Sequence, residues 1–367
     1  MKAVVLAGGS GKGLRVVTGG KPKVLMNICG RPFLERVLRN LKKSGVREVV
    51  IVTDKPAEFE DLTTRLGREM TFEVRPQQSP EVVGAMLSAS EELSRNALLI
   101  YGDTMVEPEA YLLTASLGMD SGDPVFLVVP NEDIRLYGAV SVDPEGRVVS
   151  FVEKPEREVE GAYAFGGIAV LNFELMDLIR SEKSLQEAVN KYVNGGGSIR
   201  TVLWSGVWVD LGYPINALEA MYYIMKGFSG TYISSKAEVS RTAVIEGPVF
   251  IDDGAVVEHY AVIKGPAYIG KDVMVGTHTF VRPYTDIEAD ATLGSYSEVV
   301  WSLISEGASV GRSSFLGYSI VGEGAIVEPG VLTKLLVPPG EEGIKAIKIV
   351  KKRRMYRKAG AVIPAKH

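Results

Sequence analysis

The chain has 367 residues, 46% of them hydrophobic and 23% charged, and a formal net charge of −4. These values exclude a disordered or fibrous protein and leave room for two domains. A single cysteine, Cys29, excludes an internal disulfide, and with only three histidines the sequence argues against a zinc cluster, so oxygen atoms must hold any metal.

Charge and hydropathy also limit the partners and the cellular location that we expect for the protein. Eight Lys and Arg side chains lie in residues 344–358, a stretch without acids, so the rest of the chain is more acidic than the total. That balance argues against a nucleic-acid partner. No apolar run reaches about eighteen residues, and no leader-like segment follows Met1. The sequence therefore predicts a cytoplasmic protein without a membrane span.

Strand and helix signals alternate in the first part of the chain. We expect strands at residues 2–6, 48–53 and 97–101, and helices at 32–44, 56–66 and 81–94. This alternation with continuous apolar strands predicts a mixed, mainly parallel sheet covered by helices, an α/β domain of Rossmann-like type. Further strands are expected at residues 125–129, 139–142, 148–152 and 167–171, and a helix at 173–180.

After about residue 229, an aliphatic side chain recurs at every sixth position. Eleven consecutive positions have this spacing: Val239, Ile245, Ile251, Val257, Ile263, Ile269, Val275, Val281, Ile287, Leu293 and Val299. Such a period predicts a parallel β-helix of hexapeptide repeats, with each aliphatic in a triangular core. Five-residue steps at 299–304 and 316–321 predict loops or irregular corners. We therefore expect domains at 1–228 and 229–337, and a basic tail, 338–367, packed on the β-helix.

A glycine-rich turn follows the first expected strand. Its four glycines can adopt positive φ and carry no Cβ, so successive backbone N–H groups can converge on phosphate oxygens. They are Gly8, Gly9, Gly11 and Gly13, and nearby cationic side chains are Lys12, Arg15, Lys21 and Lys23. Because open α/β sheets bind ligands at the carboxyl ends of their strands, this turn predicts a triphosphate site.

Two aspartates are candidate Mg²⁺ ligands. Asp103 follows the expected strand 97–101, at the end of the sheet where ligands bind. Asp210, in the segment Trp208-Val-Asp-Leu-Gly-Tyr-Pro, supplies a second carboxylate from a distant part of the chain. Mg²⁺ binds one or two carboxylates together with phosphate oxygens, so this pair is sufficient. Asp54 and Asp61 lack such a context and are expected to be solvated.

Residues 6–25 resemble, without a gap, the signature Leu-Ala-Gly-Gly-x-Gly-Thr-Arg-Leu with a later Pro-Lys-Pro-Leu that is typical of sugar-1-phosphate nucleotidyltransferases. The resemblance implies that Lys23 contacts phosphate and that the loop binds the nucleoside triphosphate through Leu6, Gly8, Gly9, Gly11 and Lys12. The family's loop arginine is Gly13 in this chain. Lys12 and Arg15 are the alternatives for its replacement, and we favour Arg15.

Further segments resemble the family's motifs in the same order: Tyr137-Gly-Ala-Val, Glu153-Lys-Pro, Phe165-Gly-Gly-Ile and the Trp-x-Asp of Asp210. The resemblance implies that Gly138, Glu153 and Gly167 line the sugar and that Lys154 holds its phosphate, roles that suit a carboxylate, a glycine and an ammonium group. It also implies that Gln78 and Gly84 recognise the base, although the spacing of that loop departs from the family pattern. UTP, dTTP and GTP stay open.

The expected activity is therefore Mg²⁺-dependent transfer of a nucleotidyl group from an NTP to a sugar 1-phosphate, with release of pyrophosphate. We favour glucose 1-phosphate with dTTP or UTP. The expected catalytic residues are Lys23, Arg15 and Asp103, which act by positioning the substrates and neutralising charge, with Asp103 and Asp210 on the metal.

Two alternatives stay open. The β-helix resembles the left-handed one of bifunctional enzymes that acetylate glucosamine 1-phosphate and then uridylylate it. In this chain, however, Arg312 replaces the catalytic histidine and Val300 a lysine, and an arginine cannot act as a base. His278, which could substitute, is expected on an exposed face. We interpret the β-helix as an oligomerisation domain that makes the protein a homo-oligomer. The second alternative is a non-catalytic regulatory protein that binds nucleotide sugars, motivated by Gly13.

Overall fold

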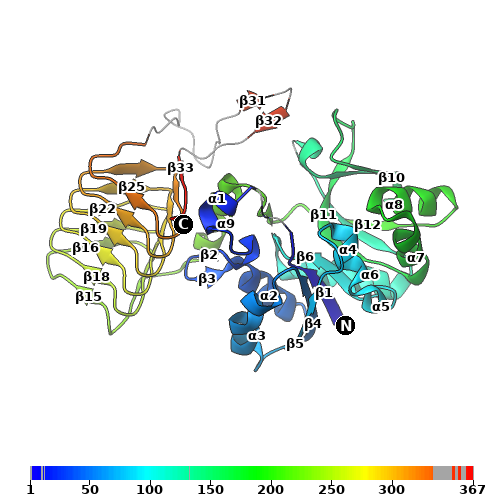
Figure 1. Ribbon diagram of the computed structural model, residues 1–367, viewed down its shortest axis with the longest axis horizontal. Coiled ribbons are helices and arrows are strands. Elements are labelled where there is room, and N and C mark those ends of the chain that lie inside the picture. Colours follow the sequence, from blue (N-terminus) through cyan, green and yellow to red (C-terminus); the bar gives the residue numbers. More distant parts are fainter. Residues whose placement is uncertain are drawn as a thin grey trace. The chain divides into compact units, whose positions relative to one another are not determined.

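The computed structural model describes residues 2–9, 11, 13–131, 133–333, 349–351, 354–356 and 361–366. The chain forms two compact units (Figure 1). The first contains residues 1–10 and 34–210, and the second contains residues 11–33 and 211–367. The glycine-rich turn thus begins in the first unit and ends in the second.

A nine-stranded mixed sheet forms the centre of the first unit. Its main path runs β10-β9-β11-β6-β1-β4-β5, and β8 pairs with β11 and β12. The strands are β1 (Lys2–Leu6), β4 (Glu48–Thr53), β5 (Thr71–Pro76), β6 (Leu98–Tyr101), β8 (Val125–Val129), β9 (Gly138–Val142), β10 (Val148–Glu153), β11 (Tyr163–Val170) and β12 (Arg200–Leu203). Strands β6, β1, β4 and β5 are parallel, whereas β11 is antiparallel to β6, β8 and β9. The predicted α/β class is confirmed.

Helices cover both faces of this sheet. They are α2 (Phe33–Lys43), α3 (Glu60–Leu66), α4 (Val82–Leu87), α5 (Ser90–Leu93), α6 (Pro108–Ser121), α7 (Phe173–Glu182) and α8 (Leu185–Asn194), with 3-10 turns η2 (Pro56–Phe59) and η3 (Ile134–Leu136). One apolar cluster joins α4, α5, α7 and α8 to the sheet through side chains such as Met86, Leu93 and Ile179. Helix α6 packs on the opposite face, where Gly118 lies so close to Val170 that a Cβ would be 2.8 Å from it.

Several local details differ from the expectations. The helix expected at 81–94 is two helices, because Ala89 leaves helical geometry at φ −129° and ψ 31°. The helix at 56–66 starts as the 3-10 turn η2 and continues as α3. Strand β5 and helices α6 and α8 were not anticipated. Strand β11 begins four residues earlier than expected, and its start pairs with β9 while its end pairs with β6.

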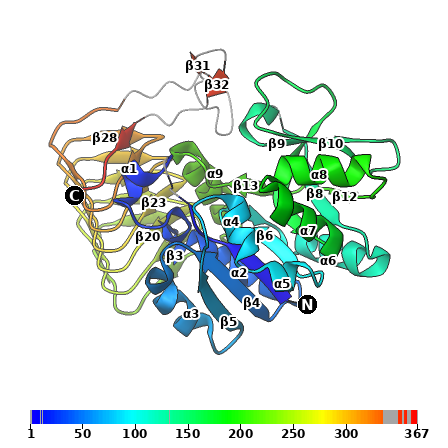
Figure 2. The ribbon, with the colours of Figure 1, turned by 45° about the vertical axis from the view of Figure 1, so that its right-hand side comes forward.

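The second unit contains the predicted β-helix, built from three parallel sheets (Figure 2). The first sheet contains β14 (Tyr232–Ile233), β17 (Val249–Ile251), β20 (Ala267–Ile269), β23 (Thr285–Ile287), β26 (Leu303–Ile304), β29 (Ile320–Val321) and β33 (Val362–Ile363). The second contains β15 (Glu238–Val239), β18 (Val256–Val257), β21 (Met274–Val275), β24 (Thr292–Leu293), β27 (Ser309–Val310) and β30 (Ile326–Val327). The third contains β16 (Val244–Glu246), β19 (Val262–Lys264), β22 (Phe280–Val281), β25 (Glu298–Val300) and β28 (Phe315–Gly317).

The six-residue period corresponds to the core of the β-helix. The aliphatics from Ile251 to Val299 are each at most 1% exposed and belong to one apolar cluster. The five-residue steps are corners shortened by one residue, where Trp301 and Tyr318 adopt φ of 48° and 50°. All three sheets keep their pairing across these corners, since Ile304 still lies beside Ile287 and Leu316 beside Val299. The steps thus shorten a corner and introduce no long loop.

Two further segments complete the second unit. Residues 11–33 form α1 (Arg15–Thr18), η1 (Lys23–Leu25) and the hairpin of β2 (Asn27–Ile28) and β3 (Arg31–Pro32). Helix α9 (Pro214–Met225) precedes the β-helix and contacts it through Tyr222, whose ring stacks on Trp301 at 5.3 Å. Within the basic tail, β31 (Ile349–Lys351) pairs with β32 (Arg354–Tyr356), and β33 adds to β29. In the described part of the chain, no helix has the length and apolar content to span a bilayer.

The six-residue period predicts which side chains of the β-helix stabilise the fold. Replacing the fully buried Ile269 by alanine should lower the free energy of unfolding by about 2–5 kcal/mol, because a cavity remains in a closely packed core. Val244→Ala, at a side chain that is 44% exposed, should change it by less than about 0.5 kcal/mol. Denaturant unfolding followed by tryptophan fluorescence would measure both, and equal changes would contradict the assigned core.

Candidate active site

The first part of the glycine turn leaves the sheet at the end of β1. Ala7 donates its N–H to the Val52 carbonyl at 2.8 Å, which continues the β1–β4 ladder by one residue. A Cβ on Gly8 would lie 1.9 Å from Gln77 Oε1, the end of a flexible side chain, and Gly9 has a φ of 124°. Gly9 therefore favours glycine by its conformation, whereas at Gly8 the Gln77 side chain packs directly against the backbone. The predicted site residues Leu6, Gly8 and Gly9 thus surround the carboxyl end of β1.

Asp103 and Asp210 come together through a short two-stranded sheet. Strand β7 (Thr104–Val106) follows Asp103 directly and is antiparallel to β13 (Trp208–Asp210). In this ladder Asp210 lies opposite Thr104, the residue next to Asp103. Since β6 is the parallel neighbour of β1, Asp103 and the turn at Gly8 leave the sheet from adjacent strands. About a hundred residues of chain separate the two carboxylates that this ladder joins.

The donor atoms of Asp103 and Asp210 suit a divalent cation. Both aspartates are partly buried, and their carboxylates are the hard oxygen donors that Mg²⁺ prefers. Among the residues that the structure describes, no group of three or more His, Cys, Asp or Glu side chains is arranged to hold a metal. Mg²⁺ commonly uses one or two carboxylates and takes its other ligands from substrate phosphates and water.

The residues expected around the sugar lie on β9, β10 and β11. Glu153 pairs with Gly138 across the β9–β10 ladder, and a Cβ on Gly138 would be 3.3 Å from the Glu153 carboxylate. Lys154 follows, with its Nζ 3.8 Å from Glu153 Oε1. Gly167 has a φ of 74°, and a Cβ there would lie 2.8 Å from Thr104 Oγ1. The sugar-side strands thus contact β7, which begins one residue after Asp103.

The hydroxyl of Tyr101, the last residue of β6, is influenced by the charges of both Glu153 and Asp103. Desolvation raises the pKa of its hydroxyl far above the usual range, and the negative charges of Glu153 and Asp103 raise it further. Its ring also packs edge-on against Phe165 at 5.6 Å. Because one hydroxyl feels both carboxylates, Glu153 and Asp103 border the same part of the unit. Desolvation likewise raises the pKa of Glu153, and the charge of Lys154 opposes that shift.

The loop proposed for the base is closed by its own hydrogen bonds. Gln78 donates its backbone N–H to Ser88 Oγ at 2.8 Å, and that hydroxyl donates to the Gly84 carbonyl at 3.0 Å. A Cβ on Gly84 would lie 1.9 Å from Ser79 Oγ. Gln78 and Gly84 are therefore brought together despite the departure in spacing.

The remaining predicted residues belong to the second unit. The Gly11 carbonyl accepts from the N–H groups of Leu14 and Arg15, both at 2.9 Å, so the turn leads directly into α1. Arg15 is exposed, Lys23 is the first residue of η1, and Lys12 lies outside the described residues.

Gly13 has a clear steric role. A Cβ at this position would lie 2.1 Å from the backbone carbonyl oxygen of Gly212, in the same unit. Neither an arginine nor any other side chain can occupy the position without a shift of the backbone. The departure from the family signature at Gly13 therefore accompanies a close approach of two backbone segments.

Sequence reasoning did not select Trp208 and Tyr137, although both stand in the quoted motifs. The indole N–H of Trp208 donates to the Gly166 carbonyl at 3.1 Å, and its ring packs against Tyr137 at 5.0 Å. Trp208 therefore ties the strand of Asp210 to both sugar-side segments. Their position within the motifs was the available signal.

The sequence also matches a known protein family. Residues 2–227 match the sequence profile of the family described as nucleotidyl transferase. The chain belongs to the nucleotidyl transferase family. It is therefore an enzyme of nucleotidyl transfer, and the resemblance drawn from the motifs, to such enzymes with a C-terminal β-helix, is confirmed.

Two relatives and one crystal structure illustrate the range of this family. A bifunctional sugar-1-phosphate nucleotidylyltransferase/acetyltransferase of Sulfurisphaera tokodaii is 28% identical over 340 residues, covering 90% of this chain and 82% of its own. A glucose-1-phosphate thymidylyltransferase of Actinoplanes sp. is 28% identical over 238 residues, covering 61% and 78%. A crystal structure of a Bacillus anthracis protein with sucrose matches 63% of this chain and 98% of its own at a TM-score of 0.54 and 20% identity, which supports the fold.

The close approach at Gly13 makes a prediction. Gly13→Ala should lower the catalytic rate by about tenfold or more, because the new methyl group must displace the Gly212 backbone or the turn itself. Gly227→Ala, where the nearest atom to a Cβ would be a carbonyl oxygen at 3.3 Å, is the control and should retain activity. Comparable rates for both variants would show that the contact with Gly212 is unimportant.

Proposed function

We propose that the protein transfers a nucleotidyl group from a nucleoside triphosphate to a sugar 1-phosphate and releases pyrophosphate. The β7–β13 ladder carries this proposal, because it joins Asp103 to Asp210 at the end of β6, the strand beside the glycine turn. Two carboxylates close together repel one another, and a divalent cation bound between them and the substrate phosphates would offset that repulsion.

In this proposal Mg²⁺ is held by Asp103 and Asp210. Bound there, it would neutralise charge on the triphosphate and so lower the electrostatic barrier to attack. The residues of the chain fit this role through the chemistry of their donors, since two carboxylates leave positions for phosphate oxygens and water. No protein nucleophile is needed.

The nucleotide side is assigned to the glycine turn and the cations that follow it. Backbone N–H groups at Gly8, Gly9 and Gly11 would bind phosphate oxygens, and Leu6 would border the nucleoside. Lys23 and Arg15, with Lys12 as the alternative to Arg15, would stabilise charge on the α-phosphate and on the departing pyrophosphate. Gln78 and Gly84 would contact the base. A thymidine triphosphate is supported by the name of the Actinoplanes relative, a glucose-1-phosphate thymidylyltransferase, and UTP is the alternative.

The sugar side is assigned to β9, β10 and β11. Glu153 would accept hydrogen bonds from sugar hydroxyls, while Gly138 and Gly167 allow the ring to approach the backbone. Lys154 would pair with the sugar phosphate as a point charge. An oxygen of that phosphate attacks the α-phosphorus in line, the bond to the β-phosphate oxygen breaks, and pyrophosphate leaves. Glucose 1-phosphate is the favoured acceptor.

The metal pair gives the first test of this function. Asp103→Ala and Asp210→Ala should each lower pyrophosphate release by about a hundredfold or more, because removing one charge-stabilising group at such a site has that effect. The measurement is a matrix of nucleoside triphosphates against sugar 1-phosphates, with and without Mg²⁺. Asp61→Ala, at a side chain that is 91% exposed, should match the unmodified protein. Full activity in Asp103→Ala, or no turnover of any pair by folded protein, would overturn the proposal.

Glu153 gives a pH prediction. Its raised pKa means that the carboxylate takes up a proton at a higher pH than an ordinary glutamate, and the protonated form accepts fewer hydrogen bonds from hydroxyls. The KM for the sugar 1-phosphate should therefore rise as the pH falls into the mildly acidic range. The substrate phosphate also titrates near pH 6, and Glu153→Gln isolates its contribution. An identical pH profile in Glu153→Gln would exclude a role for this carboxylate.

Acetyl transfer is a second candidate function, favoured by the name of the Sulfurisphaera relative. Acetyl transfer needs a base in the β-helix. Arg312 stands at the position of the expected base, but it is exposed and cannot accept a proton, and the ring of His278 stacks on that of Tyr296 at 5.0 Å. An assay of acetyl-CoA turnover with glucosamine 1-phosphate separates this candidate from nucleotidyl transfer alone. Binding of a nucleotide sugar without turnover in either assay would indicate the regulatory alternative.

We also propose a homo-oligomer formed through the β-helix. Several apolar side chains on its outer surface are well exposed, among them Met274, Ile326 and Leu332, the last at 75%. These side chains are the apolar groups that a contact between subunits could bury, and size-exclusion chromatography with light scattering would test for the oligomer. A cytoplasmic location remains a prediction, as do the domain boundaries at 228 and 337.

A further inference from the structure

The segment that follows the glycine turn is hydrogen-bonded to the β-helix along its length, all within the second unit. Glu323, on the corner after β29, donates its backbone N–H to the Val17 carbonyl at 3.2 Å. Ala365, next to β33, donates to the Val16 carbonyl at 2.8 Å. These bonds link helix α1 to the last described coil of the β-helix and to the strand added from the tail.

The strongest attachment is at the tip of the β2–β3 hairpin. Cys29 and Gly30 form its turn with φ of 50° and 74°, values of a type I′ turn. Cys29 donates its N–H to Asp286 Oδ2 at 2.7 Å, and Gly30 donates to Glu288 Oε1 at 2.9 Å. These two acids of the β-helix are 0% and 2% exposed. Two successive N–H groups therefore bind two buried carboxylates.

The fit at this tip is close. A Cβ on Gly30 would lie 2.1 Å from the Tyr268 hydroxyl, which itself donates to Asp252 Oδ2 at 3.0 Å. The hairpin thus has little freedom to move while it is docked, and only glycine suits the second turn position. The Cys29 side chain is 6% exposed.

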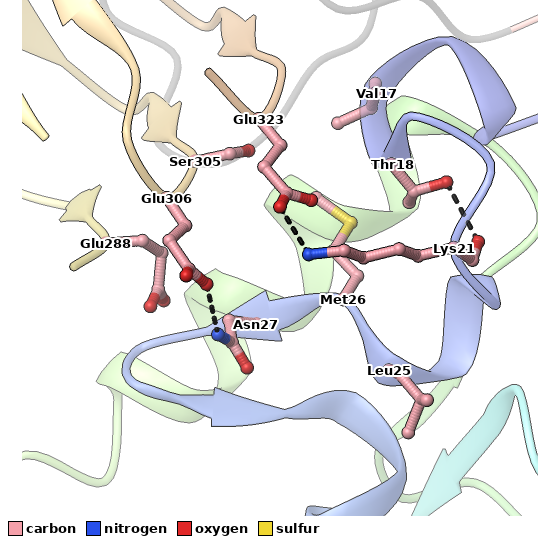
Figure 3. A pocket seen from close by; sticks show the side chains of 10 residues that line it. All are labelled: Val17, Thr18, Lys21, Leu25, Met26, Asn27, Glu288, Ser305, Glu306 and Glu323. Atoms are coloured by element: carbon pink, nitrogen blue, oxygen red, sulfur yellow. Dashed lines mark hydrogen bonds and ion pairs between the residues drawn. The ribbon is translucent and has the colours of Figure 1, made fainter. Parts of the chain in front are cut away.

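Side chains add a second line of contacts between the tip and α1. Figure 3 shows Lys21 directed at Glu323 and Asn27 at Glu306, on either side of a small cavity that Ser305 also lines. The Lys21–Glu323 pair is partly exposed, so it contributes little stability by itself. A buried N–H that loses its acceptor is more costly, which makes Asp286 and Glu288 the principal anchors.

Lys23 lies between these attachments. It begins η1, two residues after Lys21 and four before Asn27, and its carbonyl accepts from the Met26 N–H at 3.1 Å. The backbone of Lys23 is therefore fixed on one side by the Lys21–Glu323 contact and on the other by the docked hairpin. A side chain that must contact a phosphate gains from such a restraint, since a misplacement of about 1 Å can lower the rate about a hundredfold.

We propose that Asp286 and Glu288 are positioning residues for nucleotidyl transfer: they hold the β2–β3 hairpin on the β-helix and thereby place Lys23 for its phosphate. The inference rests on the proposed function, in which Lys23 contacts phosphate. It gives the β-helix a part in the nucleotidyl transfer step that is separate from oligomerisation. It also implies reciprocity, because a triphosphate bound by Lys23 must favour the docked hairpin.

The chain contains its own reporter of docking. Cys29 is the single cysteine of the 367 residues and forms the docked turn, so the rate at which a thiol reagent labels it measures local opening of the hairpin. In the full-length protein, labelling should be slow and should slow further with Mg²⁺ and a nucleoside triphosphate.

The test compares Asp286→Ala, which removes the acceptor, with Asp286→Asn, which keeps an acceptor oxygen. Asp286→Ala should label at Cys29 at least about tenfold faster and lose about ten- to a hundredfold in kcat, with the KM for the sugar 1-phosphate within about twofold of the unmodified value. Asp286→Asn should recover most of both properties. The control is Glu298→Ala, which removes a carboxylate paired with Arg282 elsewhere on the β-helix and should change neither.

Two results would overturn the proposal. The first is faster labelling of Asp286→Ala with unchanged kcat, and the second is a loss of kcat in both Asp286→Asn and Glu298→Ala that equals the loss in Asp286→Ala. If Asp286→Ala does not fold, Glu288→Ala replaces it and is compared with Glu288→Gln, which keeps an acceptor oxygen for the Gly30 N–H. Glu288→Ala should speed labelling and lower kcat, and Glu288→Gln should recover most of both, whereas no recovery contradicts the proposal. If the unmodified protein turns over no substrate, the proposed function fails separately. Protection of Cys29 by the triphosphate then still supports the positioning role, and no protection overturns it.

Discussion

The pairing of β7 with β13 is the constraint on which the catalytic arrangement depends. Three residues from each strand form the ladder, yet it brings Asp210, about a hundred residues later in the chain, opposite Thr104, the neighbour of Asp103. Two neighbouring carboxylates repel one another, so backbone hydrogen bonds must hold them together when no cation is bound. Trp208 reinforces the ladder from its own strand by its hydrogen bond to Gly166 and its contact with Tyr137.

Glycine has two distinct uses around this site. Gly9 and Gly167 have positive φ, which turns the chain where a side chain would be strained. Gly8, Gly13 and Gly138 instead allow another group to approach, a side chain at Gly8 and Gly138 and a backbone carbonyl at Gly13. At Gly13, where the family signature has an arginine, the Gly212 carbonyl occupies the place that a Cβ would need.

The β-helix combines a uniform interior with specialised corners. Its core aliphatics repeat with little variation, whereas the corners carry aromatic rings such as Tyr284, Trp301 and Tyr318, which stack from coil to coil beside helix α9. The acids that bind the hairpin of residues 27–32 lie elsewhere, Asp286 in the middle of strand β23 and Glu288 directly after it. A regular scaffold is suited to this use because its rigid, repeated geometry places successive side chains at fixed spacing.

Much of this protein follows from the sequence by itself. The glycine turn after an apolar strand and the period of six are local patterns, and local patterns specify elements because each element has its own residue period and conformational demands. The sequence indicated β11 but not its change of partner from β9 to β6, and it indicated Gly13 as unusual without the cause. Only the tertiary structure decided that Asp210 lies beside Asp103, that Trp208 connects the two sugar-side segments, and that Asp286 and Glu288 receive the turn at Cys29. These are contacts between residues far apart in the chain, and no local period records which distant backbone or carboxylate a residue will meet.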